Sequence, residues 1–185
     1  MKKKKDPKSG KKKESSGFRW PIQVFFIAIV LSAALSLASE TTLKGAGISV
    51  AVLILVLFIG LGIVFDVIGV AVTAADPRPF HSMAAHKEKG AIEALSLLRN
   101  AGRVSSICND VVGDICGIVS GTTAAVIVVR LQSALSFRSV LLSVAVTALI
   151  SGLTIGGKAL GKTFAISKST RVVYWVGRFL HVFHR

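Results

Sequence analysis

The chain has 185 residues, of which 52% are hydrophobic, and its mean hydropathy is +0.67. This composition is too apolar for a soluble domain of that size and predicts an integral membrane protein. The formal net charge is +14, and much of the basic excess lies in residues 1–20.

Residues 1–20 are predicted to form a disordered tail, because their mixture of Lys, Asp, Pro, Gly and Ser cannot bury a core. We expect the tail to contact anionic lipid head groups on the cytoplasmic side of the membrane. A protein or ribosome partner is the alternative; no aromatic residue lies among the lysines to stack on bases, so specific nucleic-acid recognition is not expected. The lysines of this predicted surface are Lys2, Lys3, Lys4, Lys5, Lys8, Lys11, Lys12 and Lys13.

Four apolar stretches follow the tail, and each is close to or beyond the ~20 residues that cross about 30 Å of hydrocarbon. They are Ile22–Ala38, Ile48–Ala75, Val104–Val129 and Val140–Gly157. The predicted fold class is therefore an all-α membrane protein with four transmembrane helices. It comprises an N-terminal anchor at 21–39 and a transmembrane domain at 45–185.

Basic residues beside the spans set the predicted orientation, since short loops rich in Lys and Arg stay in the cytoplasm. The tail, the link 76–103 and the C-terminal segment carry most of these residues, whereas the links 39–47 and 130–139 carry few. We therefore expect a multi-pass protein of the plasma membrane with both termini cytoplasmic. The alternative for the first stretch, which ends in Ser36-Leu37-Ala38, is a cleaved signal peptide.

Two further helices are predicted to lie along the inner membrane surface. Residues 81–100, which follow two prolines, carry apolar residues on one side and charged residues on the other. Residues 165–184 carry a polar stripe that includes Arg171 and Arg178, which we expect to contact lipid head groups.

Three aspartates, Asp66, Asp110 and Asp114, lie inside the second and third spans. A carboxylate there costs at least a few kcal/mol unless it faces a partner, a cavity or an ion. Counted from the inner ends of the spans, Asp66 and Asp114 lie about 14 to 15 Å deep, and Asp110 lies one turn nearer the cytoplasm. The nearest basic residue, Lys158, is expected at the inner mouth of the fourth span, so the carboxylates lack a deep cationic partner.

A hard divalent cation, magnesium in particular, suits converging oxygen ligands of this kind. The alternative is that the aspartates are protonated and hydrogen-bonded between helices. The predicted metal ligands are Asp66, Asn109, Asp110 and Asp114. The further residues of the predicted ion pathway are Gly69, Thr73, Ser106, Gly113, Ser151, Gly157 and Lys158. The glycines allow close approach of the helices.

Four motifs follow one another within residues 55–180. They are Phe65-Asp66-Val67-Ile68-Gly69-Val70-Ala71, then Met83-Ala84, Gly90, Glu93-Ala94 and Leu97-Leu98, then Asn109-Asp110-Val111-Val112-Gly113-Asp114, and finally Gly157-Lys158-Ala159-Leu160-Gly161-Lys162. In this order they resemble the elements Phe-Ser-x-x-Glu-x-Ala, Leu-Ala…Gly-x-x-Ala…Leu-Leu, Gly-Asn-x-x-x-Asn and Gly-Glu-Ile-Ile-Pro-Lys. These elements belong to the transmembrane domain of the cyclin-M/CorC (CNNM-type) family of magnesium and divalent-cation transporters.

The departures from the family pattern concern charge. The family's Ser and Glu become Asp66 and Gly69, its two Asn become Asp110 and Asp114, and its last Glu becomes Lys158. The resemblance implies a three-helix core after the anchor, a divalent-cation site between helices and a homodimer. The family's cytoplasmic nucleotide-sensing domain pair has no counterpart here, so nucleotide regulation within this polypeptide is not expected.

The sequence lacks a nucleophile–base pair, a phosphate-binding glycine loop and a Cys/His zinc pattern, so an enzyme is not expected. The predicted function is a divalent-cation transporter that binds the ion, with magnesium as the expected ion, at the intramembrane aspartates. The alternative is a non-transporting scaffold or regulatory subunit whose basic tail engages a partner protein, a ribosome or anionic lipid.

Overall fold

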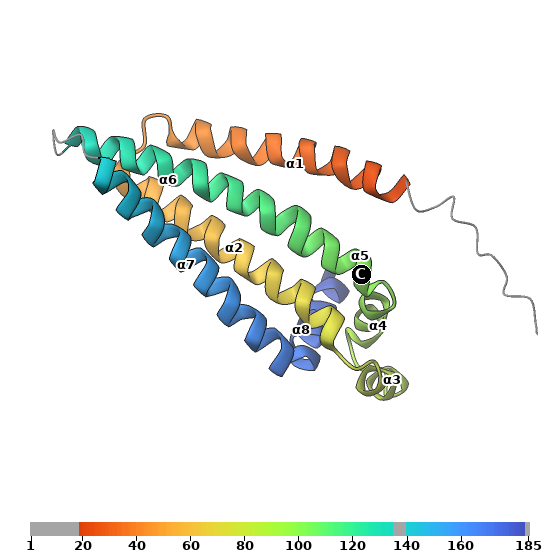
Figure 1. Cartoon of the computed structure of the whole chain (residues 1–185). Coiled ribbons are helices and arrows are strands. Elements are labelled where there is room, and N and C mark those ends of the chain that lie inside the picture. The colour runs from red at the N-terminus through yellow and green to blue at the C-terminus, as the bar shows by residue number, and fades with distance from the viewer. Residues whose placement is uncertain (1–18, 135–139, 184–185) are drawn as a thin grey trace, which may run out of the picture.

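The computed structural model of the chain describes residues 19–134 and 140–183, so the predicted lipid or partner lysines at positions 2–13 lie outside the described part. Every regular element in that part is a helix, and Figure 1 shows long helices side by side with short ones gathered at one end. The elements are α1 (Arg19–Leu43), α2 (Ile48–Ala74), α3 (Arg78–Ala85), α4 (Ala91–Arg99), α5 (Ala101–Ser106), the π-helix η2 (Ile107–Gly113), α6 (Asp114–Ala134), α7 (Val140–Ser167) and α8 (Ser169–Phe183).

Four helices in the described residues are long and apolar enough to cross a membrane, which confirms the predicted all-α membrane class with four spans. They are Trp20–Leu43, Ile48–Ala74, Ala101–Ala134 and Val140–Ser167. The third span is continuous through α5, η2 and α6. The fourth extends past the predicted end at Gly157 to Ser167, so that Lys158 lies inside the helix and not at its mouth.

The central helix of the bundle is α2, which lies between α6 and α7 (Figure 1). One stripe of α2 is buried because its residues recur at helical spacing. This stripe contains Ala51, Leu55, Gly62, Asp66 and Gly69. The outward faces of the bundle carry exposed apolar side chains such as Leu53, Leu57 and Leu153, as expected of surfaces that face lipid.

Two glycines bring α7 close to α2. A Cβ added to Gly157 would lie 2.6 Å from Ile63 Cδ1, and one added to Gly161 would lie 2.9 Å from Val67 Cγ2. Both distances are too short for carbon atoms, so a larger residue at either position would force Ile63 or Val67 to shift. This spacing of small residues four apart is the usual device for close packing of membrane helices, and it fixes Lys158 beside α2.

Helix α1 lies along the third span on the side away from α7 (Figure 1). Val24, Ala28, Leu31 and Leu35 pack against the core cluster formed by Val111, Ile115 and Val119. Polar contacts hold both ends of α1. The Arg103 guanidinium lies 5.0 Å from the centre of the Trp20 ring, and Arg130 Nη2 donates to the Leu43 carbonyl at 2.6 Å. The predicted anchor 21–39 is therefore part of the packed bundle.

The segment predicted as one helix at 81–100 is divided into α3 and α4 by a turn. Lys87 and Gly90 both have positive φ, 57° and 90°, which no continuous α-helix contains. Helix α4 packs against α8 through Gly90 and Gly177, and His181 Nδ1 lies 2.7 Å from Glu93 Oε1. The predicted C-terminal helix 165–184 begins at Ser169, because α7 continues to Ser167.

Candidate functional site

Helix α2 and the third span run antiparallel with a register set by small residues. A Cβ added to Gly62 would lie 3.3 Å from Cys116 Cβ, and one added to Gly113 would lie 3.0 Å from Asp66 Oδ1. Asp66 is therefore level with Gly113, the residue before Asp114. This register agrees with the similar depth that counting along the spans predicted for Asp66 and Asp114.

The three aspartates nevertheless face different surroundings. Asp66 is buried, whereas Asp110 and Asp114 are exposed on the surface of the third span. Among the residues that the structure describes, no three His, Cys, Asp or Glu side chains lie close enough together to hold a metal ion. The predicted convergence of three carboxylates is therefore not found. The reason is that Gly113 faces α2, so its neighbour Asp114 points away from that helix.

A basic partner for Asp66 comes from α7. Lys158 Nζ lies 3.4 Å from Asp66 Oδ2, and the side chains are 24% and 5% exposed respectively. Charged side chains inside membrane-spanning helices commonly pair in this way, because each neutralises the other in a medium of low polarity. The expectation that the carboxylates lack a basic partner was wrong, because α7 continues as a helix past Gly157 to Ser167 and brings Lys158 to Asp66.

Asn109 occupies the next layer of the α2–η2 contact. A Cβ added to Gly69 would collide with Asn109 Oδ1, so the glycine makes the space that this side chain fills. Asn109 Nδ2 donates to Ser105 Oγ at 3.2 Å, but the buried Oδ1 has no hydrogen-bond partner. Gly69 lies one helical turn from Asp66 on the same buried stripe of α2. A carboxylate and an unpaired amide oxygen thus lie in adjacent layers of one helix contact.

The backbone that carries Asn109 and Asp110 is a π-helix, Ile107–Gly113. Short π-helical segments inside α-helices are rare and frequently mark functional sites. Ser106 Oγ donates to Asp110 Oδ2 at 2.6 Å, which holds the exposed carboxylate against the helix. No pattern in the sequence indicated the π-helix or predicted Ser105 as a partner of Asn109.

The remaining predicted pathway residues lie apart from this contact. Thr73 donates to the Val70 carbonyl at 2.9 Å and lines a cavity of about 380 Å³ that also includes His81 and Arg99. Ser151 is exposed on α7. Gly157 acts in α2–α7 packing. The structure therefore brings together Asp66, Gly113 and Lys158, and separately Gly69 and Asn109, but neither Thr73 nor Ser151 joins them.

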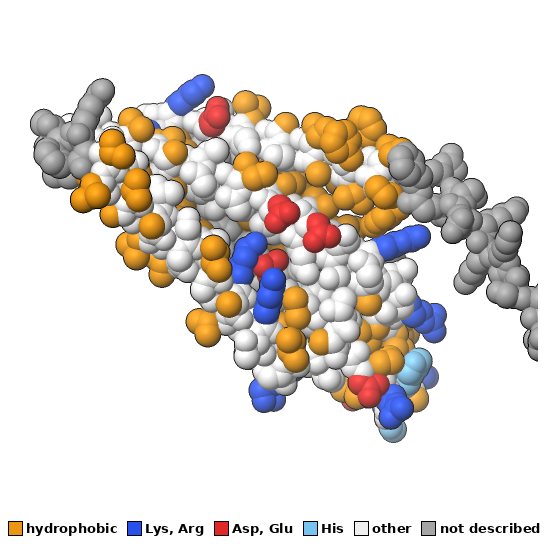
Figure 2. Space-filling model, in the orientation of Figure 1, with side chains coloured by type: hydrophobic (Ala, Val, Ile, Leu, Met, Phe, Trp, Pro, Cys, Tyr) orange, Lys and Arg blue, Asp and Glu red, His pale blue; other side chains and the backbone are white. Residues whose placement is uncertain are grey.

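Figure 2 shows acidic and basic side chains gathered at mid-length of the bundle on one face, between bands of apolar side chains. Lys162, one turn beyond Lys158, is exposed, as are Asp110 and Asp114. Charged residues on the outer surface of membrane-spanning helices require water, a partner or an ion. Lys158, the ion-pair partner of the buried Asp66, lies one turn before Lys162 on α7.

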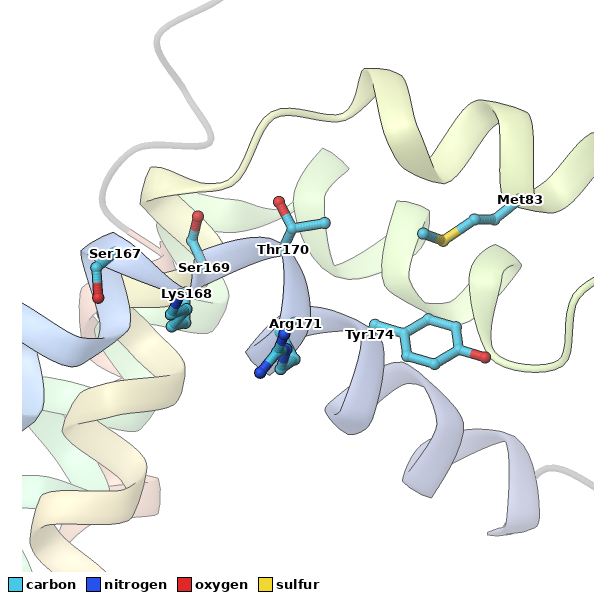
Figure 3. A pocket seen from close by; sticks show the side chains of 7 residues that line it. All are labelled: Met83, Ser167, Lys168, Ser169, Thr170, Arg171 and Tyr174. Carbon is cyan, nitrogen blue, oxygen red and sulfur yellow. The ribbon is translucent and has the colours of Figure 1, made fainter.

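The predicted lipid contacts of the C-terminal segment lie at the other end of α7. Arg171 lines a cavity of about 420 Å³ at the corner between α7 and α8. Figure 3 shows Lys168 and Arg171 on one side of this corner and the hydroxyls of Ser169 and Thr170 on the other. Arg178 is exposed on α8. The basic side chains of this segment are therefore accessible, as contact with head groups requires.

Comparisons of the chain with protein-family models, with curated proteins and with solved structures find no match. The resemblance to the cyclin-M/CorC family stays a sequence-based prediction. The functional proposal accordingly rests on the geometry of the helix contacts.

Proposed function

We propose that this protein binds a divalent cation, magnesium in the simplest case, between α2 and the third span and carries it across the membrane. The role is one of binding and transport and involves no enzymatic step. One observation carries the proposal. The buried Asp66 carboxylate and the Asn109 Oδ1, which has no hydrogen-bond partner, lie in adjacent layers of the α2–η2 contact.

The chemistry of these groups suits a hard cation. Magnesium binds carboxylate and carbonyl oxygens and commonly retains several waters, so it needs only one or two carboxylates from the protein. Asp66 and Asn109 supply two such oxygens. Asp110 and Asp114, exposed on the same helix, provide negative charge along the approach, and Ser106 orients Asp110. Gly69 and Gly113 allow the helix contact in which the ion is held.

A second function is favoured by the ion pair itself. Lys158 already neutralises Asp66, so the pair can have a purely structural role in the α2–α7 contact without any bound ion. On this alternative the protein is a non-transporting scaffold or regulatory subunit, and its basic tail engages a partner protein, a ribosome or anionic lipid.

We propose a plasma-membrane location with both termini in the cytoplasm, supported by the basic residues of the α3–α4 end. Contact of Arg171 and Arg178 with anionic head groups is part of this proposal and is supported by their exposure. A homodimer is also proposed, supported by exposed small residues of the third and fourth spans, such as Gly121 and Gly152, that leave room for a second copy.

The test is magnesium-dependent thermal stabilisation of the purified protein, followed by magnesium flux in liposomes. We expect magnesium to stabilise wild type, Asp114→Asn to weaken the effect and Asp66→Asn to abolish it. Asp76→Asn is the matched control, because Asp76 is exposed after the end of α2. Stabilisation that survives Asp66→Asn unchanged contradicts the site. Binding without flux would favour the scaffold.

A further inference from the structure

We propose that Lys158 is a tethered counter-ion that occupies Asp66 when no divalent cation is bound and must leave when one arrives. This inference rests on the proposed cation site and adds its regulation: the protein supplies its own competitor for the ion. The pair joins α2 to α7, and both helices are long and apolar enough to cross a membrane.

The two side chains of the ion pair differ in how deeply they are buried. The Asp66 side chain is 5% exposed and enclosed by α2, η2 and α7, whereas the Lys158 side chain is 24% exposed. A lysine has a flexible four-carbon stem that ends in a compact ammonium group. The carboxylate is therefore fixed in the contact, and the ammonium is the member of the pair that is free to move toward the open side.

The backbone of α7 on both sides of Lys158 is held against α2. Gly157 and Gly161 flank this lysine and lie so close to Ile63 and Val67 of α2 that a larger residue would require these side chains to shift. The backbone of α7 is therefore held against α2 while the lysine side chain reaches Asp66. Movement of the ammonium does not require the helices to separate, since the stem alone changes its rotamer.

The charge of Asp66 must be balanced by one cation at a time. A single carboxylate without a counter-charge is unfavourable inside a membrane-spanning bundle. Lys158 Nζ, which lies 3.4 Å from Asp66 Oδ2 and 3.8 Å from a Cβ added to Gly113, stands on the side where a cation bound to Asp66 meets η2. Two cations that share one carboxylate repel each other, so ammonium and divalent ion exclude one another at Asp66. The empty site is thus neutral, and the ion binds only by displacing the lysine.

The experiment titrates magnesium into wild type, Lys158→Met and Lys162→Met. The readout is the thermal unfolding temperature at each magnesium concentration. We expect the magnesium concentration for half-maximal stabilisation to fall by at least about tenfold in Lys158→Met, because a nearby positive competitor is removed. Lys162→Met is the matched control, one turn along α7 and exposed, and it should resemble wild type. Equal midpoints in all three proteins would overturn the inference and leave the cation site standing.

If magnesium stabilises none of the three proteins, the proposed cation site is wrong and the counter-ion role falls with it. A measurement on the wild-type chain guards against misfolding of the variant. Acetylation of lysines, read by mass spectrometry, should be slow at Lys158 without magnesium and faster with it, while Lys162 stays constant. No magnesium-dependent change at Lys158, in protein that magnesium does stabilise, contradicts displacement.

Discussion

Gly69 is the residue on which the α2–η2 contact depends most directly. An added Cβ would collide with Asn109, whereas one added to Gly60, nine residues earlier on α2, would meet nothing within 4 Å. We expect Gly69→Val to destabilise the protein by about 1–3 kcal/mol, the usual cost of overpacking. Gly60→Val is the control and should have little effect. The measurement is thermal or denaturant unfolding in detergent; equal losses in both variants would contradict the close contact.

For single residues, the sequence predicted the depth of Asp66 and Asp114 along the bundle but not the direction in which each side chain points. A constant rise per residue places Asp66 and Asp114 at one level without knowledge of packing. Which way each side chain points depends on the neighbouring helix and on the π-helix that precedes Asp114, and a longer turn rotates every later residue. The partner of Asp66 was missed for a related reason: Lys158 ends the apolar run that predicts the fourth span, whereas the helix itself continues to Ser167.

Among the helices, α4 and α8 form the tightest contact outside the spans, and Gly90 tests it. Gly90 has φ +90°, and its added Cβ would lie 2.5 Å from the Arg178 backbone nitrogen. Gly45 has nearly the same conformation, φ +87°, with nothing within 4 Å. Gly45→Ala should therefore show only the left-handed strain of about 1–2 kcal/mol.

Gly90→Ala adds a steric clash to that strain, so we expect it to release α8 from α4. Hydrogen exchange of the α8 amides should then increase well beyond the change seen in Gly45→Ala. Protection of α8 that is the same in both variants would mean that the Gly90 contact does not hold the helix.

The ends and divisions of the helices separate what the sequence predicted from what it did not. Apolar length is a local property, so the four spans were predicted with ends that differ by up to ten residues, the fourth ending at Ser167 and not at Gly157. The division of 81–100 was not predicted, since a helical pattern of apolar residues continues across the turn. Gly90 was the available signal: glycine favours the left-handed conformation that ends one helix and begins another.

For the whole molecule, the central prediction is that the α3–α4 and α8 end faces the cytoplasm. Figure 1 places these helices at one end of the bundle and the α1–α2 link at the other. The link 76–103 carries five Lys or Arg residues and the link 44–47 carries one. Short basic segments stay inside because their translocation is unfavourable, so this asymmetry predicts a cytoplasmic α3–α4 and α8 end.

Cysteine labelling in intact cells measures this orientation. An impermeant maleimide should label Lys44→Cys from outside and should label His86→Cys only after the membrane is opened; both positions are exposed. Wild type is the control, because its cysteines Cys108 and Cys116 are free but buried. Labelling of His86→Cys in intact cells would reverse the orientation. Labelling of both positions in intact cells would mean that α2, the long helix between them, does not span the membrane, since a single span places its two ends on opposite sides.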